Sequence, residues 1–249
     1  MSNGETIVVF GATSAVAQSL IKLHASNGDG VILVARNSDH LKIIADDIKA
    51  KYNTSVSTMV SDLADISEHE PLVESLRKIS GDISRYYFFY GVLPDQKECE
   101  QSIELTLAAI NTNFLSKISL LNLLANKIEK EGERSLVVVS SVAGDRGRQS
   151  NYVYGTSKGA LSIYLQGLRN RLSKANCHVV TVKPGFIDTP MTADFDKGGL
   201  LWASPDTVAK DIYKASLKNK DIIYSPWFWR YIMLIIKLIP ERIFKKLNL

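Results

Sequence analysis

Short apolar runs rich in β-branched residues recur along this chain, and longer stretches of helical character separate them. There are seven such runs: Thr6–Phe10, Val31–Ala35, Val56–Val60, Tyr86–Gly91, Leu136–Ser140, Val179–Lys183 and Ile222–Tyr224. The runs are apolar almost throughout instead of alternating with polar residues. Such a pattern indicates strands that are buried on both faces of a parallel sheet.

The helical stretches between these predicted strands are Ala15–Ala25, His40–Lys51, Glu70–Ile79, Ile103–Glu131, Tyr152–Lys174 and Pro205–Leu217. Ser204, Pro205 and Asp206 form a good helix start, with a capping hydroxyl, a preset φ and an acid in the first turn. The alternation of strands and helices predicts a single doubly wound α/β domain of about seven parallel strands, with helices on both faces of the sheet.

With 45% hydrophobic and 22% charged residues, the chain has the composition of an ordinary globular protein, which excludes a disordered chain or a disulfide scaffold. Its two cysteines, Cys99 and Cys177, form no CxxC motif and are expected to be thiols in a reducing compartment. The four histidines are far apart in the sequence, so we expect no metal site.

The formal net charge of +4 lies entirely in residues 222–249, so residues 1–221 are formally neutral. A neutral body argues against nucleic-acid binding, which needs a basic face. The N-terminus has no signal-peptide pattern. The longest apolar stretch, Tyr231–Ile239, is interrupted by Lys237 and is too short to span a bilayer as a straight helix. We therefore expect a cytoplasmic protein.

The turn after the first strand, Phe10-Gly11-Ala12-Thr13-Ser14-Ala15-Val16-Ala17, is made mostly of small residues. In a doubly wound sheet this turn leads into a helix N-terminus, where free N–H groups and the helix dipole bind phosphate. A small-residue turn that only packs closely fits the same residues, since the GxGxxG pattern is absent. Arg36, at the end of the second strand, suits a ribose 2′-phosphate, although a solvated arginine is the commoner case at a strand end.

Tyr154 and Lys158 are four residues apart in a predicted helix, so their side chains share one face. A nearby ammonium favours the phenolate and lowers the pKa of a tyrosine, which is otherwise about 10. Such a tyrosine suits acid–base catalysis near neutral pH. Ser141 lies just beyond the fifth strand, at the edge where sheets of this type bind ligands. Taken alone, a tyrosine and a lysine at this spacing are more often a surface pair than a catalytic one.

Six segments together resemble the short-chain dehydrogenase/reductase family, over about residues 5–225. They are Gly11-Ala12-Thr13-Ser14-Ala15-Val16-Ala17, Asp62-Leu63, Asn113, Ser140-Ser141-Val142-Ala143-Gly144, Tyr154-Gly155-Thr156-Ser157-Lys158 and Pro184-Gly185-Phe186-Ile187-Asp188-Thr189. The resemblance implies a Rossmann fold, with residues 1–221 as the dinucleotide-binding and catalytic domain and residues 222–249 as an apolar, aromatic and basic C-terminal tail.

The resemblance also implies hydride transfer between a nicotinamide cofactor and a carbonyl or alcohol. Tyr154 is then expected to protonate the developing alkoxide as a ketone is reduced. Lys158 is expected to lower the pKa of Tyr154 and to bind the nicotinamide ribose. Ser141 is expected to donate a hydrogen bond to the substrate oxygen, and Asn113 to hold a water in the proton relay behind the lysine.

By the same resemblance, Asp62 is expected to meet the adenine, and Gly185, Ile187 and Thr189 to flank the nicotinamide and its phosphate side. The complete predicted cofactor set is Gly11, Thr13, Ser14, Ala15, Val16, Arg36, Asn37, Asp62, Leu63, Gly91, Tyr154, Lys158, Pro184, Gly185, Ile187 and Thr189. Arg36 without a neighbouring acid favours NADP(H) over NAD(H). The chain departs from the family at Ala15 and Ala17, where glycine is usual, and at Phe89-Tyr90-Gly91-Val92, where the family commonly has Asn-Asn-Ala-Gly.

The C-terminal tail contains two of the three tryptophans, and as one helix it places Arg230, Lys237 and Glu241 on a single stripe. Two interpretations remain open. The tail is either an interfacial helix on an anionic membrane, or it is buried against the protein body or a second subunit.

Residues Met191–Trp202 are expected to form a lid in which Thr192, Phe195, Leu200, Leu201 and Trp202 line an apolar pocket. A mobile loop that only closes over the core fits the same residues. These residues therefore do not identify the substrate.

The small-residue turn and the aromatic, basic C-terminus are loosely similar to reductases that act on a ketosugar linked to a polyprenyl phosphate, the decaprenylphosphoryl-2-ketoribose reductase type. This similarity suggests a lipid-linked or amphiphilic carbonyl substrate and a location at the inner face of the membrane. A non-catalytic NADP(H)-binding sensor is the alternative, but a sensor has no need of Tyr154. Family resemblance also implies a homodimer or homotetramer built from Ile103–Glu131 and Tyr152–Lys174.

Overall fold

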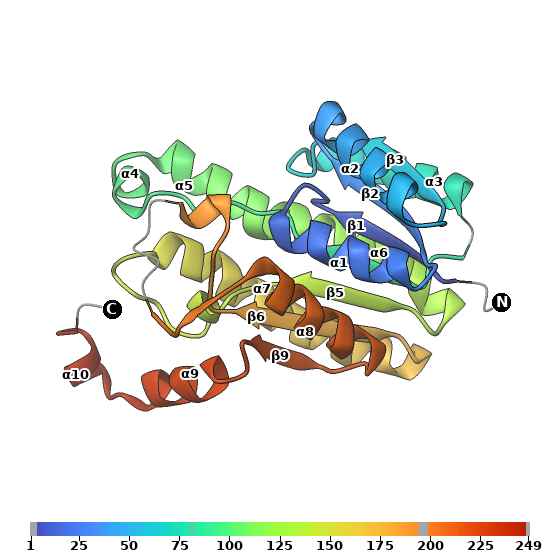
Figure 1. The fold of residues 1–249 in the computed structure, drawn as a ribbon. Helices are drawn as coiled ribbons and strands as arrows, with labels where there is room; N and C mark the ends of the chain where they lie inside the picture. The colour runs from blue at the N-terminus through green and yellow to red at the C-terminus, as the bar shows by residue number, and fades with distance from the viewer. Residues whose placement is uncertain (1–3, 81, 194–198, 248–249) are drawn as a thin grey trace.

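The computed structural model describes residues 4–80, 82–193 and 199–247. Its centre is one parallel sheet with the strand order β3-β2-β1-β4-β5-β6-β9 (Figure 1). The strands are β1 (Thr6–Phe10), β2 (Gly30–Ala35), β3 (Val56–Val60), β4 (Arg85–Phe88), β5 (Ser135–Val139), β6 (His178–Pro184) and β9 (Ile222–Ser225). The strand order reverses between β1 and β4, which makes this the topological switch point of the sheet.

Helices cover both faces of the sheet (Figure 1). On one face lie α1 (Ala15–Ser26), α2 (Ser38–Lys51) and α8 (Pro205–Leu217); on the other lie α3 (His69–Ile79), α6 (Ser116–Glu131) and α7 (Tyr152–Leu172). Ile7 and Val9 of β1 belong to the first core, whereas Val8 and Phe10 belong to the second. Strands β1, β2, β4, β5 and β6 thus supply buried residues to both cores, which explains why these segments are unbroken apolar runs, whereas the edge strands β3 and β9 are only partly buried.

The remaining elements stand around the carboxyl end of the sheet, except for the turn directly before β6. They are α4 (Gln96–Gln101), α5 (Ile103–Ile110), α9 (Trp229–Leu238), α10 (Glu241–Phe244), the short strands β7 (Phe186–Ile187) and β8 (Trp202–Ala203), and the single turns η1 (Ile66–Glu68), η2 (Asn111–Leu115), η3 (Val142–Gly144), η4 (Ser173–Ala175) and η5 (Pro190–Thr192).

Two predicted elements differ in the structure. The helix expected over residues 103–131 is divided into α5 and α6 by the π-helical turn η2. Such turns insert one extra residue per turn and occur mostly at functional sites. The strand expected to reach Gly91 ends at Phe88, because Phe89 is the last residue whose N–H bonds to β1 and the chain then turns away into the cleft.

The C-terminal segment is partly built into the body. Strand β9 pairs in parallel with β6, so the first residues of the segment 222–249 complete the sheet. The prediction of one C-terminal helix is wrong. The chain leaves helical geometry at Ile239 (ψ 121°), directly before Pro240, so Glu241 begins a separate helix and does not share a stripe with Arg230 and Lys237.

Helix α9 packs on the body through one face. Trp229 and Met233 are buried together with Val142 of η3, and Phe186 and Tyr224 pack at the edge of this cluster. Arg146 holds the junction of α9 and α10, because it donates hydrogen bonds to the carbonyl oxygens of Ile236 and Ile239 and pairs with Glu241. The other face of α9 is exposed. Among the described residues, no helix has the length and apolar character needed to cross a bilayer.

Candidate active site

The turn after β1 is shaped to receive an anion. Gly11 has φ +81°, and a Cβ atom there would lie 2.5 Å from the backbone nitrogen of Tyr90, so this position requires glycine. Ser14 is the N-cap of α1, but its side chain makes no capping hydrogen bond, and the first turn contains no acid. The first N–H groups of α1 are therefore left for a ligand, and the helix dipole favours a negative one.

This turn opens into a cleft of about 460 Å³ at the switch point of the sheet. All four predicted catalytic residues line the cleft, as do the predicted cofactor residues with one exception. The exception is Asn37, whose side chain caps α2 by accepting a hydrogen bond from the His40 N–H at 2.9 Å. Arg36 does line the cleft; its side chain is 72% exposed and lies 3.9 Å from the Asp62 carboxylate. Asp62 is the only acid among the described residues that line the cleft.

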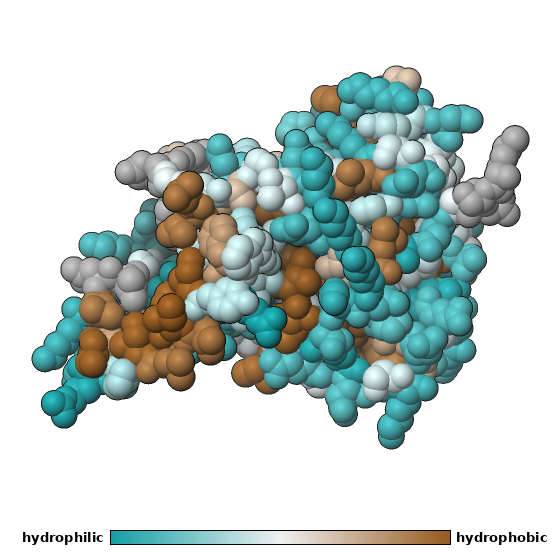
Figure 2. Space-filling model, turned by 60° about the horizontal axis from the view of Figure 1, so that its bottom comes forward, coloured by the Kyte–Doolittle hydropathy of each residue, from teal (hydrophilic) through white to brown (hydrophobic). Residues whose placement is uncertain are grey.

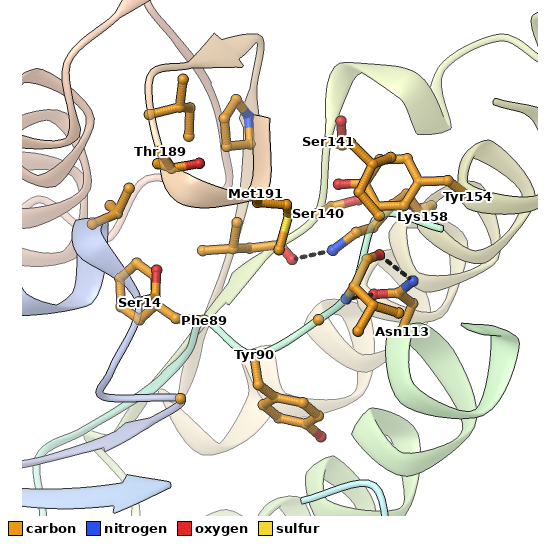
Figure 3. Close-up of a pocket in the computed structure, with 18 of the residues that line it drawn as sticks. Ser14, Phe89, Tyr90, Asn113, Ser140, Ser141, Tyr154, Lys158, Thr189 and Met191 are labelled. Carbon is orange, nitrogen blue, oxygen red and sulfur yellow. Dashed lines mark hydrogen bonds between the residues drawn. The ribbon is translucent and has the colours of Figure 1, made fainter. Parts of the chain in front are cut away.

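Ser141, Tyr154 and Lys158 lie together at the other end of the cleft (Figure 3). Ser141 follows β5 directly and begins η3, whereas Tyr154 and Lys158 lie one turn apart on α7. The Lys158 Nζ lies 5.4 Å from the centre of the Tyr154 ring and donates a hydrogen bond to the Val139 carbonyl oxygen at 3.2 Å. The two side chains thus meet on one face of the helix, as their spacing predicts.

Burial dominates the proton affinities of this group. It raises the pKa of Tyr154 to about 12, and hydrogen bonding with Ser141 opposes this effect. Burial also lowers the pKa of Lys158 to about 8, while the neighbouring Lys117 side chain opposes that change. The expected lowering of the tyrosine pKa by the lysine therefore does not appear here, because burial raises the pKa and only the hydrogen bond with Ser141 opposes it.

Asn113 lies in the π-helical turn η2 and is fully buried. Its side chain clasps the backbone of Val92 twice: its Oδ1 accepts from the Val92 N–H at 3.0 Å and its Nδ2 donates to the Val92 carbonyl at 2.8 Å. The segment after β4 is thereby fixed against α5 and α6. Gly91 permits this approach, since a Cβ atom at its φ of +158° would lie 2.7 Å from Asn113 Oδ1.

Sequence reasoning missed three polar side chains near this end of the cleft. Lys117 is fully buried one helical turn after Asn113, and this i, i+4 spacing was the available signal. Arg148 and Asn151 line the cleft from the loop between η3 and α7. Both lie between two family-like segments, which was the available signal for them.

Only part of the predicted lid, Met191–Trp202, lines the cleft. Met191 and Thr192 line the cleft, whereas Leu200, Leu201 and Trp202 do not. Trp202 instead stacks on Phe186 with 5.2 Å between ring centres, and Leu200 is 95% exposed. Phe195 lies outside the described residues. Within the described part of the chain, no cluster of histidine, cysteine and carboxylate side chains is suited to a metal ion.

Known oxidoreductases are similar to this chain over most of its length. The model of the family described as short chain dehydrogenase matches residues 5–198. An uncharacterized oxidoreductase of Mycobacterium tuberculosis is 32% identical over 241 residues, covering 97% of this chain and 96% of the relative. An uncharacterized oxidoreductase of Staphylococcus haemolyticus is 25% identical, with 86% and 91% covered.

Solved structures confirm the predicted doubly wound fold. L-sorbose reductase from Gluconobacter frateurii, complexed with NADPH and L-sorbose, has a TM-score of 0.79 at 20% identity, covering 89% of this chain and 95% of that one. A short-chain dehydrogenase from Sphingobium yanoikuyae in complex with NADPH has a TM-score of 0.83 at 20% identity, covering 95% and 97%. With the family model matching most of its length, the chain belongs to the short-chain dehydrogenase/reductase family.

Proposed function

We propose that this protein is an NADP(H)-dependent oxidoreductase that transfers hydride between the nicotinamide and a carbonyl or alcohol. The observation that carries the proposal is the single cleft that joins an anion-binding helix N-terminus to the Ser141, Tyr154 and Lys158 side chains. A phosphate site at one end and an acid–base group at the other suit a dinucleotide that reaches from the first to the second.

The residues of the cleft fit NADP(H). The open N-terminus of α1 and the close approach at Gly11 suit a pyrophosphate. Arg36, at the end of β2, has its guanidinium largely in solvent, 3.9 Å from the Asp62 carboxylate, and this position suits binding of a 2′-phosphate. The structural neighbours from Gluconobacter frateurii and Sphingobium yanoikuyae are NADPH complexes, which supports the same cofactor.

When bound, the cofactor supplies the hydride, and the side chains manage the proton. With a pKa of about 12, Tyr154 is a protonated phenol at neutral pH, so its hydroxyl is ready to donate to an oxygen that is gaining charge. Ser141 donates a hydrogen bond to the same oxygen. Lys158 holds positive charge below the phenol, and Asn113 fixes the backbone that forms the floor of the cleft.

Tyr154→Phe tests the proposal directly, because it removes the proton donor and keeps the ring. The variant is expected to bind NADPH with unchanged affinity, measured by fluorescence, and to lose nearly all NADPH-dependent ketone reduction. Tyr152→Phe is the matched control, since Tyr152 lies at the start of α7, outside the cleft. If wild-type protein binds NADPH but reduces no ketone in a broad screen, the sensor alternative replaces the enzyme.

We further propose that the substrate is amphiphilic, of the lipid-linked type. Burial lowers the pKa of the Arg148 guanidinium with no acid to compensate, and its buried Nε has no hydrogen-bond partner among the described residues. An anionic group on the substrate would pair with this arginine. Phe186 lines the cleft and also packs against Trp229 of α9, so an apolar chain leaving the cleft meets the C-terminal helix.

The outer face of α9 suits an anionic membrane. Figure 2 shows hydrophobic side chains gathered over the C-terminal segment, at the lower left of the view. The exposed apolar residues of this face are Trp227, Tyr231, Leu234, Ile235 and Leu238. Arg230, Lys237, Arg242, Lys245 and Lys246 are exposed around them, which provides charge complementarity to anionic headgroups at the inner face of a membrane.

Vesicle flotation tests the membrane face. Wild-type protein is expected to float with phosphatidylglycerol vesicles and not with phosphatidylcholine vesicles. Ile235→Glu should abolish flotation, whereas Ile43→Glu, at an equally exposed isoleucine on α2, should not. Equal flotation of both glutamate variants would contradict the membrane face.

Arg148→Met should raise KM for phosphorylated or prenyl-phosphate ketosugars and leave KM for neutral ketones unchanged.

We also propose a homo-oligomer that forms through α5 and α7. Ile103, Leu105 and Leu107 of α5 and Ile163 of α7 are exposed apolar side chains on these two adjoining helices. Light scattering coupled to gel filtration tests this proposal, and Ile163→Glu is expected to shift the protein toward the monomer.

A further inference from the structure

We propose that Lys117 is a positioning residue of the active site: an uncharged amine that accepts a hydrogen bond from the Lys158 ammonium and holds it beneath the cleft. The inference rests on the proposed function, in which Lys158 supports the proton donor Tyr154.

Lys117 is anomalous for a lysine. It lies on α6 with none of its surface exposed, and its Nζ donates no hydrogen bond to any of the described residues. A lysine is almost never fully buried unless it is paired, because a buried ammonium loses its hydration. No carboxylate compensates for that loss here, since the described residues give Lys117 no ion pair.

The amine is located directly behind the catalytic lysine. A Cβ atom at Gly91 would lie 3.6 Å from the Lys117 Nζ and 3.7 Å from the Lys158 Nζ, so the two nitrogens flank one point of the backbone. The Lys117 Nζ also lies 4.8 Å from the centre of the Tyr90 ring. Lys117 thus extends from α6 toward α7 beneath the segment that Asn113 clasps.

The groups that face Lys117 leave it uncharged. From α7, the charged group that faces Lys117 is Lys158. From the segment after β4, the group that faces it is the Tyr90 ring, which carries no charge. From α3, His69 lies against α6, and its ring nitrogens are taken up by the Ser119 hydroxyl and the Leu63 carbonyl. Burial, and then repulsion from Lys158, lower the pKa of Lys117 well below that of a free lysine.

A neutral amine has a lone pair, so Lys117 can accept a hydrogen bond from the Lys158 ammonium. Two ammonium groups close together in a dry interior repel each other, whereas an ammonium can donate a hydrogen bond to a neutral amine. The nearby Lys117 amine raises the pKa of Lys158, so it favours the charged form of Lys158 and works against burial. The pair therefore carries the charge of one proton, and Lys158 holds it on the side of Tyr154.

Lys117→Met separates a positioning role from packing alone, because methionine keeps the length of the side chain and removes the amine. If Lys117 only fills space, the Lys117→Met substitution should not change the kinetics of ketone reduction. A positioning lysine should instead give a variant that is more stable at pH 7, since a fully buried amine is gone, and that has altered catalysis. Lys130→Met, at an exposed position of α6, is the matched control.

The first readout is the pH profile of kcat for NADPH-dependent ketone reduction. The alkaline midpoint of Lys117→Met is expected to move toward acid by more than about half a unit, because Lys158 loses its acceptor. Lys117→Gln, whose amide oxygen still accepts a hydrogen bond, should restore much of the wild-type profile. Identical profiles for the methionine, glutamine and wild-type proteins would overturn the inference.

The second readout needs no activity and so separates this inference from the proposed function. The pKa of Lys117 is lower in the folded protein than in the unfolded chain, so folding releases a proton and stability rises with pH up to about 10.5. In wild type, the unfolding equilibrium constant should fall by up to about tenfold per pH unit across this window, and Lys117→Met should lack this component. The same slope in both proteins would refute an uncharged Lys117 even if the enzyme proves active.

Discussion

Gly185 and Trp229 offer a quantitative test of how the C-terminal helix is docked. Gly185 follows β6 and lines the cleft, and a Cβ atom there would lie 1.9 Å from the Trp229 Nε1 and 2.0 Å from its Cε2. An alanine would need the indole to move by about 1.5 Å to reach ordinary contact, in a site where Trp229 is 3% exposed. Gly185→Ala should therefore destabilise the protein by about 1–3 kcal/mol through overpacking.

Trp229→Ala alone should destabilise the protein by about 3–5 kcal/mol, toward the lower limit because its buried Nε1 has no hydrogen-bond partner among the described residues. In the double variant the new methyl enters the space left by the indole, so Gly185→Ala should add little or nothing. The expected coupling free energy is about 1–3 kcal/mol in the favourable direction.

Urea unfolding followed by far-UV circular dichroism measures all four proteins, with unchanged m-values as the check that the native state is the same. Gly167→Ala is the matched control. A Cβ atom at Gly167, in the interior of α7, would have no atom of another segment within 4 Å, so this variant should be more stable by about 0.5–1 kcal/mol. If the two destabilising effects add within about 0.5 kcal/mol, Trp229 does not cover Gly185 and α9 is not docked as described.

Three further predictions concern single side chains. Arg36→Leu should raise KM for NADPH by about tenfold and leave KM for NADH unchanged, because the lost contact is to the 2′-phosphate; an equal rise for both cofactors would contradict this. Burial lowers the pKa of His69, so stability should decrease as pH falls below about 6.5; the urea midpoint of His69→Gln should decrease less between pH 7.5 and 5 than that of wild type. Arg146→Gln should free the junction of α9 and α10 and increase trypsin cleavage at Lys237, with catalysis retained; unchanged cleavage would show that the junction is held by other contacts.

The sequence was most informative where a residue's role depends on its immediate neighbours. Runs such as Val31–Ala35 are apolar because both faces are buried, and that property is visible without coordinates. Tyr154 and Lys158 meet because helical spacing alone brings them to one face. Asn37 was misplaced for the same reason that it was attractive: a polar residue after β2 suits either a ribose or a helix cap, and local capping of α2 took the side chain.

Features that depend on distant segments were not accessible in this way. Trp229 is buried against Gly185, which lies more than 40 residues earlier in the sequence, before β9. The periodicity of apolar residues in the sequence cannot indicate a contact between such distant residues. Lys117 was missed because a lysine on a predicted helix is normally a solvated residue, and only the packing of α6 against α7 beneath Gly91 makes it a buried one.

The proton affinity of Tyr154 illustrates how packing can reverse a local expectation and still serve the chemistry. A lysine one turn away predicts a lowered pKa, yet burial raises the pKa of Tyr154 to about 12 and lowers that of Lys158 to about 8. At neutral pH the phenol is therefore protonated and its neighbour still mostly charged, which is the state that a proton donor to a carbonyl oxygen requires. In the reductive direction, activity should then decline as pH rises through the pKa of Lys158, well before the phenol itself ionises. A decline that begins only near pH 10, in wild type and Lys117→Met alike, would mean that the lysine pair does not control the reaction.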